Sequence, residues 1–109
     1  MKNQKPLPYL QFAVMGVLTK KKLPGREIRR ELERLGVKKA GPAFYRLMAR
    51  MEEATLIDGW YQQEVVEGQI FRERVYKALP AGLQAWMYTR DFHTAVIRHS
   101  SEGRSVSPA

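Results

Sequence analysis

The sequence contains no cysteine and no long apolar run. Disulfide bonds and thiolate metal sites are therefore excluded. No stretch approaches the roughly 18 consecutive apolar residues that a membrane-spanning helix needs. The first residues, MKNQKP, lack the apolar centre of a signal peptide. Neither membrane insertion nor export is indicated, and a cytoplasmic location fits these absences.

Motifs for catalysis and metal binding are also missing. The two histidines, His93 and His99, share no face of a helix and have only Asp91 near them. No Ser/His/Asp order, glycine-rich phosphate loop or isolated carboxylate pair occurs. We therefore expect no metal, no cofactor and no enzymatic activity.

Positive charge, in contrast, is abundant and unevenly distributed. The 109 residues are enough for one domain with a modest core, and they have a net charge of +8. Residues 1–54 contain 13 Lys and Arg against 5 Asp and Glu, whereas residues 55–109 contain 6 of each. All of the excess lies in the first half, which favours an acidic polymer as the partner, most simply nucleic acid.

Two helices joined by a short turn are predicted in this basic half. The first opens at Pro24-Gly25, and Gly36 is placed to cap its end. The second opens at Gly41-Pro42, after a turn of about five residues. This order is the sequence form of a helix-turn-helix. The basic residues at the first helix start and in the turn are expected to contact DNA phosphates: Arg26, Lys38 and Lys39.

The second of these helices has two different faces. One is apolar at the period of an α-helix and consists of Phe44, Leu47, Met48 and Met51. The opposite face carries Tyr45, Arg46, Ala49 and Arg50, which we interpret as a set that reads bases in the major groove. Arginine commonly pairs with guanine O6 and N7, and an alanine can contact a thymine methyl group.

A purely structural interpretation of this outer face stands beside that one. Most exposed helix faces are charged because they are solvated. Arg50 in particular could form a surface ion pair with Glu53 or Glu33.

A β-hairpin is predicted directly after this helix. Residues 60–66 and 69–77 have β-forming composition, and Glu67-Gly68 is a suitable two-residue turn between them. A hairpin in this position is a wing. Gln69, Arg72 and Arg74 are expected near its tip, where they would reach phosphate or the minor groove or would only solvate the hairpin.

The remaining segments flank this arrangement. We expect a flexible leader at 1–8, a winged helix-turn-helix domain at 9–79 that begins with a buried helix at 10–18, a terminal helix at 80–99 and a disordered tail at 100–109. The fold class is α+β and mainly helical, with three helices and a two-stranded β wing before the terminal helix.

The terminal helix has apolar residues on two sides. One side consists of Leu83, Trp86 and Met87. About half a turn round lie Phe92, Ala95 and Val96, beside Ala85 and Tyr88. One small domain can cover only one side, so the second is predicted to pack on another copy of the protein. A break of the helix near Arg90–Asp91 is the alternative. The predicted dimer interface contains Trp86, Tyr88, Phe92, Ala95 and Val96.

Three segments together resemble the PadR-like winged-helix transcriptional regulators. Residues 23–28 (LPGREI) are similar to the family's Leu-His-Gly-Tyr-Glu-Ile turn. Residues 44–57 (FYRLMARMEEATLI) are similar to its Leu-Tyr-x-x-Leu-x-x-Leu-Glu-x-x-Gly-Leu-Ile signature. Residues 75–82 (VYKALPAG) are similar to its Tyr-Tyr-x-Leu-Thr-x-x-Gly pattern.

The resemblance implies a homodimeric repressor that binds double-stranded DNA and dimerises through its last helix. It also implies that Trp86 would contact a small aromatic effector. We therefore predict a transcriptional regulator that occludes a promoter. A winged-helix adaptor for protein–protein contact is the alternative. RNA binding is disfavoured, because the exposed aromatic residues form no stacking platform for single strands.

Overall fold

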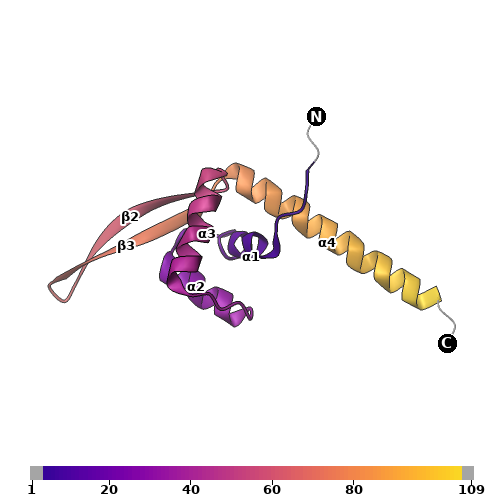
Figure 1. Ribbon diagram of the computed structural model, residues 1–109, viewed down its shortest axis with the longest axis horizontal. Helices are drawn as coiled ribbons and strands as arrows, with labels where there is room; N and C mark the ends of the chain where they lie inside the picture. The colour runs from indigo at the N-terminus through magenta and orange to yellow at the C-terminus, as the bar shows by residue number, and fades with distance from the viewer. Residues whose placement is uncertain (1–3, 107–109) are drawn as a thin grey trace.

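A computed structural model of the chain describes residues 4–106 and has four helices around one end of a small sheet. The order is α1 (Tyr9–Val17), β1 (Leu23–Pro24), α2 (Gly25–Arg34), α3 (Gly41–Glu53), β2 (Ile57–Val66), β3 (Gln69–Ala78) and α4 (Pro80–Val106). The hairpin β2–β3 projects from one side of the helical body, and α4 runs away from it on the other side (Figure 1). The predicted class, a mainly helical winged helix-turn-helix, is confirmed.

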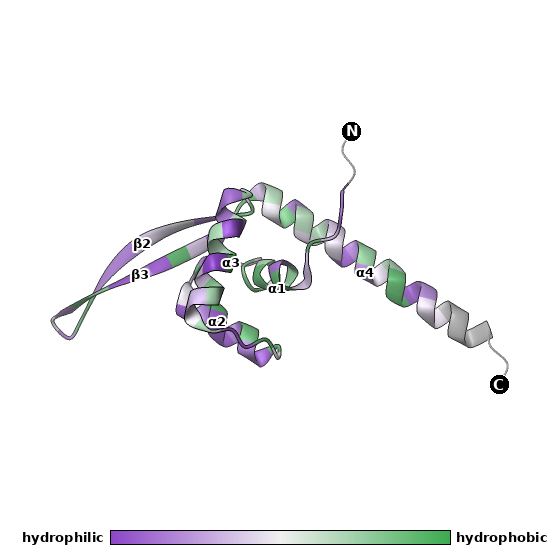
Figure 2. Cartoon of the chain, viewed as in Figure 1, coloured by the Kyte–Doolittle hydropathy of each residue, from purple (hydrophilic) through white to green (hydrophobic). Residues whose placement is uncertain are grey.

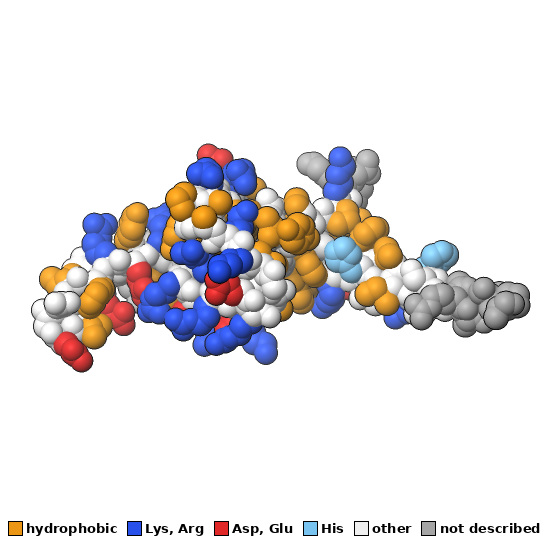
Figure 3. Space-filling model, turned by 60° about the horizontal axis from the view of Figure 1, so that its bottom comes forward, with side chains coloured by type: hydrophobic (Ala, Val, Ile, Leu, Met, Phe, Trp, Pro, Cys, Tyr) orange, Lys and Arg blue, Asp and Glu red, His pale blue; other side chains and the backbone are white. Residues whose placement is uncertain are grey.

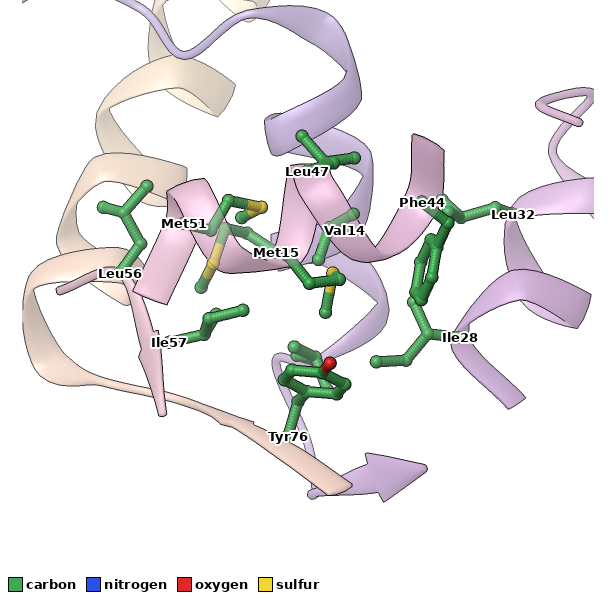
Figure 4. Close-up of a cluster of buried hydrophobic side chains, with 12 residues drawn as sticks. Val14, Met15, Ile28, Leu32, Phe44, Leu47, Met51, Leu56, Ile57 and Tyr76 are labelled. Atoms are coloured by element: carbon green, nitrogen blue, oxygen red, sulfur yellow. The ribbon is translucent and has the colours of Figure 1, made fainter. Parts of the chain in front are cut away.

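The core lies where α1, α2 and α3 meet the base of the sheet (Figure 4). Val14 and Met15 of α1, Ile28 of α2 and Phe44 of α3 are fully buried, and Tyr76 closes the cluster from β3. Burial of each large apolar side chain contributes about 2 kcal/mol to the free energy of unfolding. Helix α1 is mostly green, the colour of hydrophobic residues, as expected for a helix that packs between other elements (Figure 2).

The hairpin has the predicted turn. Glu67 and Gly68 both have positive φ, 50° and 79°, and Val66 pairs with Gln69 directly beside them. Two positive φ values in a two-residue loop define a turn whose twist matches that of the strands. The register of the hairpin is thereby fixed from its tip to Ile57, which pairs with Ala78.

The sheet contains a third strand that the sequence did not suggest. β1 pairs antiparallel with β3, Leu23 with Tyr76 and Pro24 with Val75, so the strand order is β1-β3-β2. A residue before proline is biased towards extended backbone, which explains why Leu23 can pair before α2 begins. The first residues of α2 are consequently held at the base of the wing.

The two helices α2 and α3 end in the same way. After α2, the N–H of Val37 donates to Leu32 O and that of Gly36 to Glu33 O, with Gly36 at φ 90°. After α3, the N–H of Leu56 donates to Met51 O and that of Thr55 to Glu52 O. Both are helix ends that normally require glycine in the left-handed region. Gly36 was predicted in this role, whereas the second cap uses Thr55 at φ 57°.

α4 is one continuous helix, so the alternative of a break near Arg90–Asp91 is wrong. It also extends beyond the expected end at His99, to Val106. Between Pro80 and Pro108 the sequence contains no proline, and adding residues to an existing helix costs little. The expected disordered tail is therefore helical over 100–106, and 107–109 lie outside the described residues. No helix within 4–106 is both long and apolar enough to cross a membrane.

The N-terminal leader is only partly as expected. Residues 1–3 lie outside the described part of the chain, but the next residues are held against α4. The N–H of Leu7 donates to Thr89 Oγ1 at 2.9 Å, and Tyr88 Oη donates to Gln4 O at 3.1 Å. Thr89 is fully buried, and its hydroxyl donates in turn to Ala85 O. Prediction from composition missed this, because the attachment depends on two hydrogen bonds between residues more than 80 positions apart.

We expect Thr55→Gly to raise the free energy of unfolding by about 0.5–1 kcal/mol. A β-branched residue in the left-handed region is strained by about 1–2 kcal/mol, and the greater freedom of glycine in the unfolded chain offsets part of the gain. Thr55→Ala, which keeps a Cβ, is the matched control and should give little stabilisation. Urea denaturation followed by circular dichroism would measure both, and a less stable glycine variant would contradict the account.

Gly82→Ala should lower the free energy of unfolding by at least about 2 kcal/mol, as expected for overpacking against backbone. A Cβ at Gly82 would lie 2.1 Å from Leu56 O and 2.8 Å from Met15 Cε. Helix propensity alone predicts the opposite sign, a gain of about 1 kcal/mol. Thermal denaturation would decide between the two, with the neighbouring Ala81→Ser as a control that should change stability by less than about 0.5 kcal/mol.

Candidate nucleic-acid interface

The outward face of α3 is the centre of the site. The four apolar residues of the opposite face, Phe44, Leu47, Met48 and Met51, are all buried, as the periodicity predicted. Their burial turns Tyr45, Arg46, Ala49 and Arg50 to solvent. Among the described side chains, neither Arg46 nor Arg50 has a carboxylate partner, so Arg50 does not form the ion pair considered with Glu53 or Glu33.

A hollow of about 860 Å³ lies between α3 and the wing. Its aromatic walls come from both sides, Tyr45 on α3 and Tyr61 and Phe71 on the hairpin. Tyr45 is tilted back onto the start of α2, because Gly25 has no Cβ that would meet the tyrosine ring. Ala49 adds a small side chain, which leaves room for a ligand to approach the helix.

Two ion pairs connect the wing to the helices at this hollow. Arg26 at the start of α2 donates from Nε to Glu73 Oε1 of β3 at 2.9 Å, and it also contacts Glu27. Arg74 of β3 donates to Glu52 Oε1 of α3 at 2.9 Å. Arg26 is exposed, whereas Arg74 and Glu52 are both about three-quarters buried. The direction of the wing is thus set partly by charge.

The same contacts shift three pKa values. The hydrogen bond and the charge of Glu73 raise the pKa of Arg26. Burial lowers the pKa of Arg74, but Glu52 outweighs it and the net shift is upward. Burial raises the pKa of Tyr76 to about 12, against the opposing charge of Arg74. All three groups therefore keep their protons at neutral pH, two as cations and Tyr76 as a neutral phenol.

The three predicted wing residues lie at different distances from the tip. Gln69 follows the turn, Arg72 pairs with Gln63 farther down, and Arg74 pairs with Tyr61 near the base. Both arginines lie over the Tyr61 ring, at 4.7 Å and 5.0 Å. Arg74 is thus not at the tip, where it was expected. From position 61 to 71 the hairpin has no Lys or Arg.

The distal wing, residues 61–71, differs in character from the basic half of the chain. Glu64 and Glu67 are its only charged residues, and Val65 and Ile70 are exposed beside them. Basic side chains instead gather over the helical body between the wing and α4, as Figure 3 shows for one face. Contact with an acidic polymer is therefore favoured at α3 and the helical body, and disfavoured at the wing tip.

The two lysines in the turn between α2 and α3 differ in their exposure to solvent. Lys38 is exposed and Lys39 is half-buried. Arg29 of α2 fixes this turn, because its guanidinium donates to Lys39 O at 3.1 Å and lies 6.0 Å from the centre of the Phe44 ring. Arg29 was not singled out from the sequence, where nothing distinguishes it from its neighbour Arg30.

The structure thus brings together only part of the predicted set. Tyr45, Ala49, Arg26, Arg72 and Arg74 line one hollow. Arg46, Arg50, Lys38, Lys39 and Gln69 are not among its lining residues. Sequence analysis missed Tyr61 and Glu73, and neither could have been found without the hairpin register, which places them opposite Arg74 and Gln62.

The predicted dimer residues on α4 fall into two groups. Trp86 is half-buried, stacks on Phe12 with ring centres 6.1 Å apart, and has the guanidinium of Arg90 5.3 Å from its ring. The others are exposed: Tyr88, Phe92, Ala95 and Val96. In the part of the chain that the structure describes, no group of three His, Cys, Asp or Glu side chains could hold a metal ion.

Comparison with known proteins identifies the fold. No protein-family model matches the sequence, and no curated protein matches it significantly. Solved structures do match. A PadR family transcription regulator from Clostridium difficile has a TM-score of 0.75 at 20% identity, over 87% of this chain and 97% of that chain. A protein from Streptococcus mutans has a TM-score of 0.71 at 17% identity, over 96% and 98%.

A third matching structure is a complex with DNA. Bacillus subtilis PadR in complex with operator DNA has a TM-score of 0.61 at 20% identity, over 81% of this chain but 48% of that longer chain. The class of protein that the fold defines is therefore the winged helix-turn-helix protein with a long terminal helix. Within that class, the chain has the fold of the PadR family transcription regulators, as the sequence resemblance predicted.

Proposed function

We propose that this chain is a transcription regulator that binds a specific site on double-stranded DNA as a homodimer. The observation that carries the proposal is the outward face of α3, where Arg46 and Arg50 are exposed and have no carboxylate partner among the side chains that the structure describes. An α-helix fits the major groove of DNA, and unpaired arginines can make bidentate contacts with guanine. Bacillus subtilis PadR, which shares the fold, was solved in complex with operator DNA, and this supports DNA binding as the function of the chain.

The arrangement assigns different tasks to the basic residues. Lys38 and Lys39 lie in the turn before α3 and would contact phosphates, which position the protein without reading sequence. Arg26 was predicted in the same role, but Glu73 and Glu27 engage it in the unbound protein, so it would have to leave them to reach a phosphate. Arg72 is the wing residue best placed for a phosphate, since Arg74 is engaged by Glu52. Occlusion of a promoter by the bound protein would make it a repressor acting in the cytoplasm.

Two other functions make different predictions about binding. A winged-helix adaptor for protein partners would bind DNA only weakly, and this binding would disappear at physiological salt. An RNA-binding protein would prefer single strands. Fluorescence anisotropy with duplex DNA from upstream of the gene, scrambled duplex and single-stranded RNA, each at several salt concentrations, separates the three. We expect preference for the native duplex to persist near 150 mM salt, where charges are screened beyond about 8 Å.

Arg46→Ala and Arg50→Ala should each weaken binding to the preferred duplex by about 1–3 kcal/mol. Thermal stability should not change, because both side chains are exposed and unpaired. Anisotropy on preferred and scrambled duplexes measures the effect, and Arg98→Ala on α4 is the matched control for loss of one positive charge. An equal loss on both duplexes would mean that these arginines contact only phosphate.

The terminal helix supports the dimer. Its first half packs on the body through Leu83, Ala85 and the buried Thr89. Its second half continues past the body (Figure 1) and leaves Phe92, Val96 and Ile97 exposed at 44%, 46% and 65%. Green bands are also visible along this projecting half of α4 (Figure 2). A second copy is the partner proposed to cover them.

Val96→Glu should convert the dimer to monomers, because an unpaired carboxylate buried in an apolar contact costs several kcal/mol. Arg98→Glu, which lies away from both Val96 and Ile97 around α4, is the control and should remain dimeric. Sedimentation velocity would measure both, with circular dichroism as a check on folding. A Val96→Glu dimer as stable as wild type would contradict the proposed interface.

An aromatic effector near Trp86 stays a prediction. The indole already stacks on Phe12, so a ligand would have to bind at the exposed part of the ring or displace Phe12.

A further inference from the structure

Two adjacent carboxylates end α3, and they have different surroundings. Glu52 is turned towards the wing and accepts the hydrogen bond from Arg74. Glu53 is exposed, lines the same hollow as Tyr45 and Ala49, and has no hydrogen-bond or ion-pair partner among the described side chains. Glu73, the third glutamate that lines the hollow, is paired with Arg26. Glu53 is thus the carboxylate of this surface that the protein leaves unneutralised.

Its position on the helix continues the outward face. Glu53 follows Ala49 by four residues and Arg46 by seven, so at 100° per residue it points between these two side chains. The four residues from Ala49 to Glu53 advance about 6 Å along the helix axis. This distance is close to the spacing of two base pairs, about 3.4 Å each, when the helix lies along the groove. Glu53 would therefore face a base pair beyond those that Ala49 and Arg50 can reach.

An unpaired carboxylate on this face disfavours contact with a polyanion. Binding to any duplex would bring Glu53 close to phosphate charge, which lowers affinity regardless of sequence. The major groove offers one compensating partner, because the N4 amine of cytosine donates a hydrogen bond and glutamate is its usual acceptor. Repulsion between Glu53 and the phosphates would weaken binding to every DNA sequence, and a cytosine at one position would offset it. The difference between the two cases would make binding specific for that cytosine.

We propose that Glu53 is a specificity-determining residue, which accepts a hydrogen bond from the N4 amine of a cytosine in the operator. The inference rests on the proposed DNA binding and adds one base to what α3 reads. It makes a prediction that no arginine on α3 shares: removal of Glu53 strengthens binding to unrelated DNA while it weakens discrimination at one position.

Three variants test this. Glu53→Ala removes both the acceptor and the charge. Glu53→Gln removes the charge but supplies an amide, which pairs with adenine N6 and N7 in preference to cytosine. Asp91→Asn on α4 is the matched control, since it removes one negative charge outside the DNA-facing surface, where Asp91 contacts Arg90.

The experiment is selection from a random duplex library, followed by anisotropy on the selected site and its single-base variants. Wild type should enrich a site with one cytosine that depends on Glu53. Glu53→Ala should lose preference at that position by about tenfold and bind scrambled duplex a few-fold more tightly. Glu53→Gln should shift the preference there from cytosine to adenine. Asp91→Asn should keep the wild-type site.

Two outcomes would overturn the inference, and they are distinguishable. If wild type enriches a site and Glu53→Ala selects the same site with the same preference at every position, the inference is wrong and the proposed function stands. If wild type enriches no sequence at all, the proposed function fails and the inference fails with it. Circular dichroism of both Glu53 variants, which are exposed at a helix end, would establish that they are folded.

Discussion

Burial of one face of α3 is the constraint on which the rest of the site depends. Phe44, Leu47, Met48 and Met51 face the core, so a rotation of the helix would expose several of them at about 2 kcal/mol each. The outward face is fixed by the same packing. The core also holds Tyr76, through which β3 and the whole wing are attached to the helices. The outward positions of Tyr45, Arg46, Ala49 and Arg50 therefore follow from one amphipathic pattern.

Much of this could be predicted from sequence because it depends on local patterns. The two faces of α3 follow from the period of the helix, the hairpin from Glu67-Gly68, and the end of α2 from Gly36. What could not be predicted depends on contacts between distant residues. β1 is two residues long and is defined only by its pairing with Val75 and Tyr76.

Composition was misleading at the two ends of the chain. The polar residues after His99 suggested disorder, yet helix α4 continues over 100–106, where no proline stops it. The leader has two prolines and suggested flexibility, yet hydrogen bonds to Thr89 and Tyr88 hold it on α4. The ion pairs at the hollow join residues 47 and 22 positions apart, and no periodicity could have indicated them.

Those ion pairs bear on how the affinity of this protein for DNA should be interpreted. The slope of affinity against salt concentration is commonly read as a count of phosphates neutralised. Here salt would also screen Arg26 from Glu73, an exposed pair that helps to orient the wing. Part of the measured slope would then arise from the greater mobility of the wing in the unbound protein at high salt, and not from phosphate contacts. A phosphate count from titration alone would exceed the number of contacts in the complex.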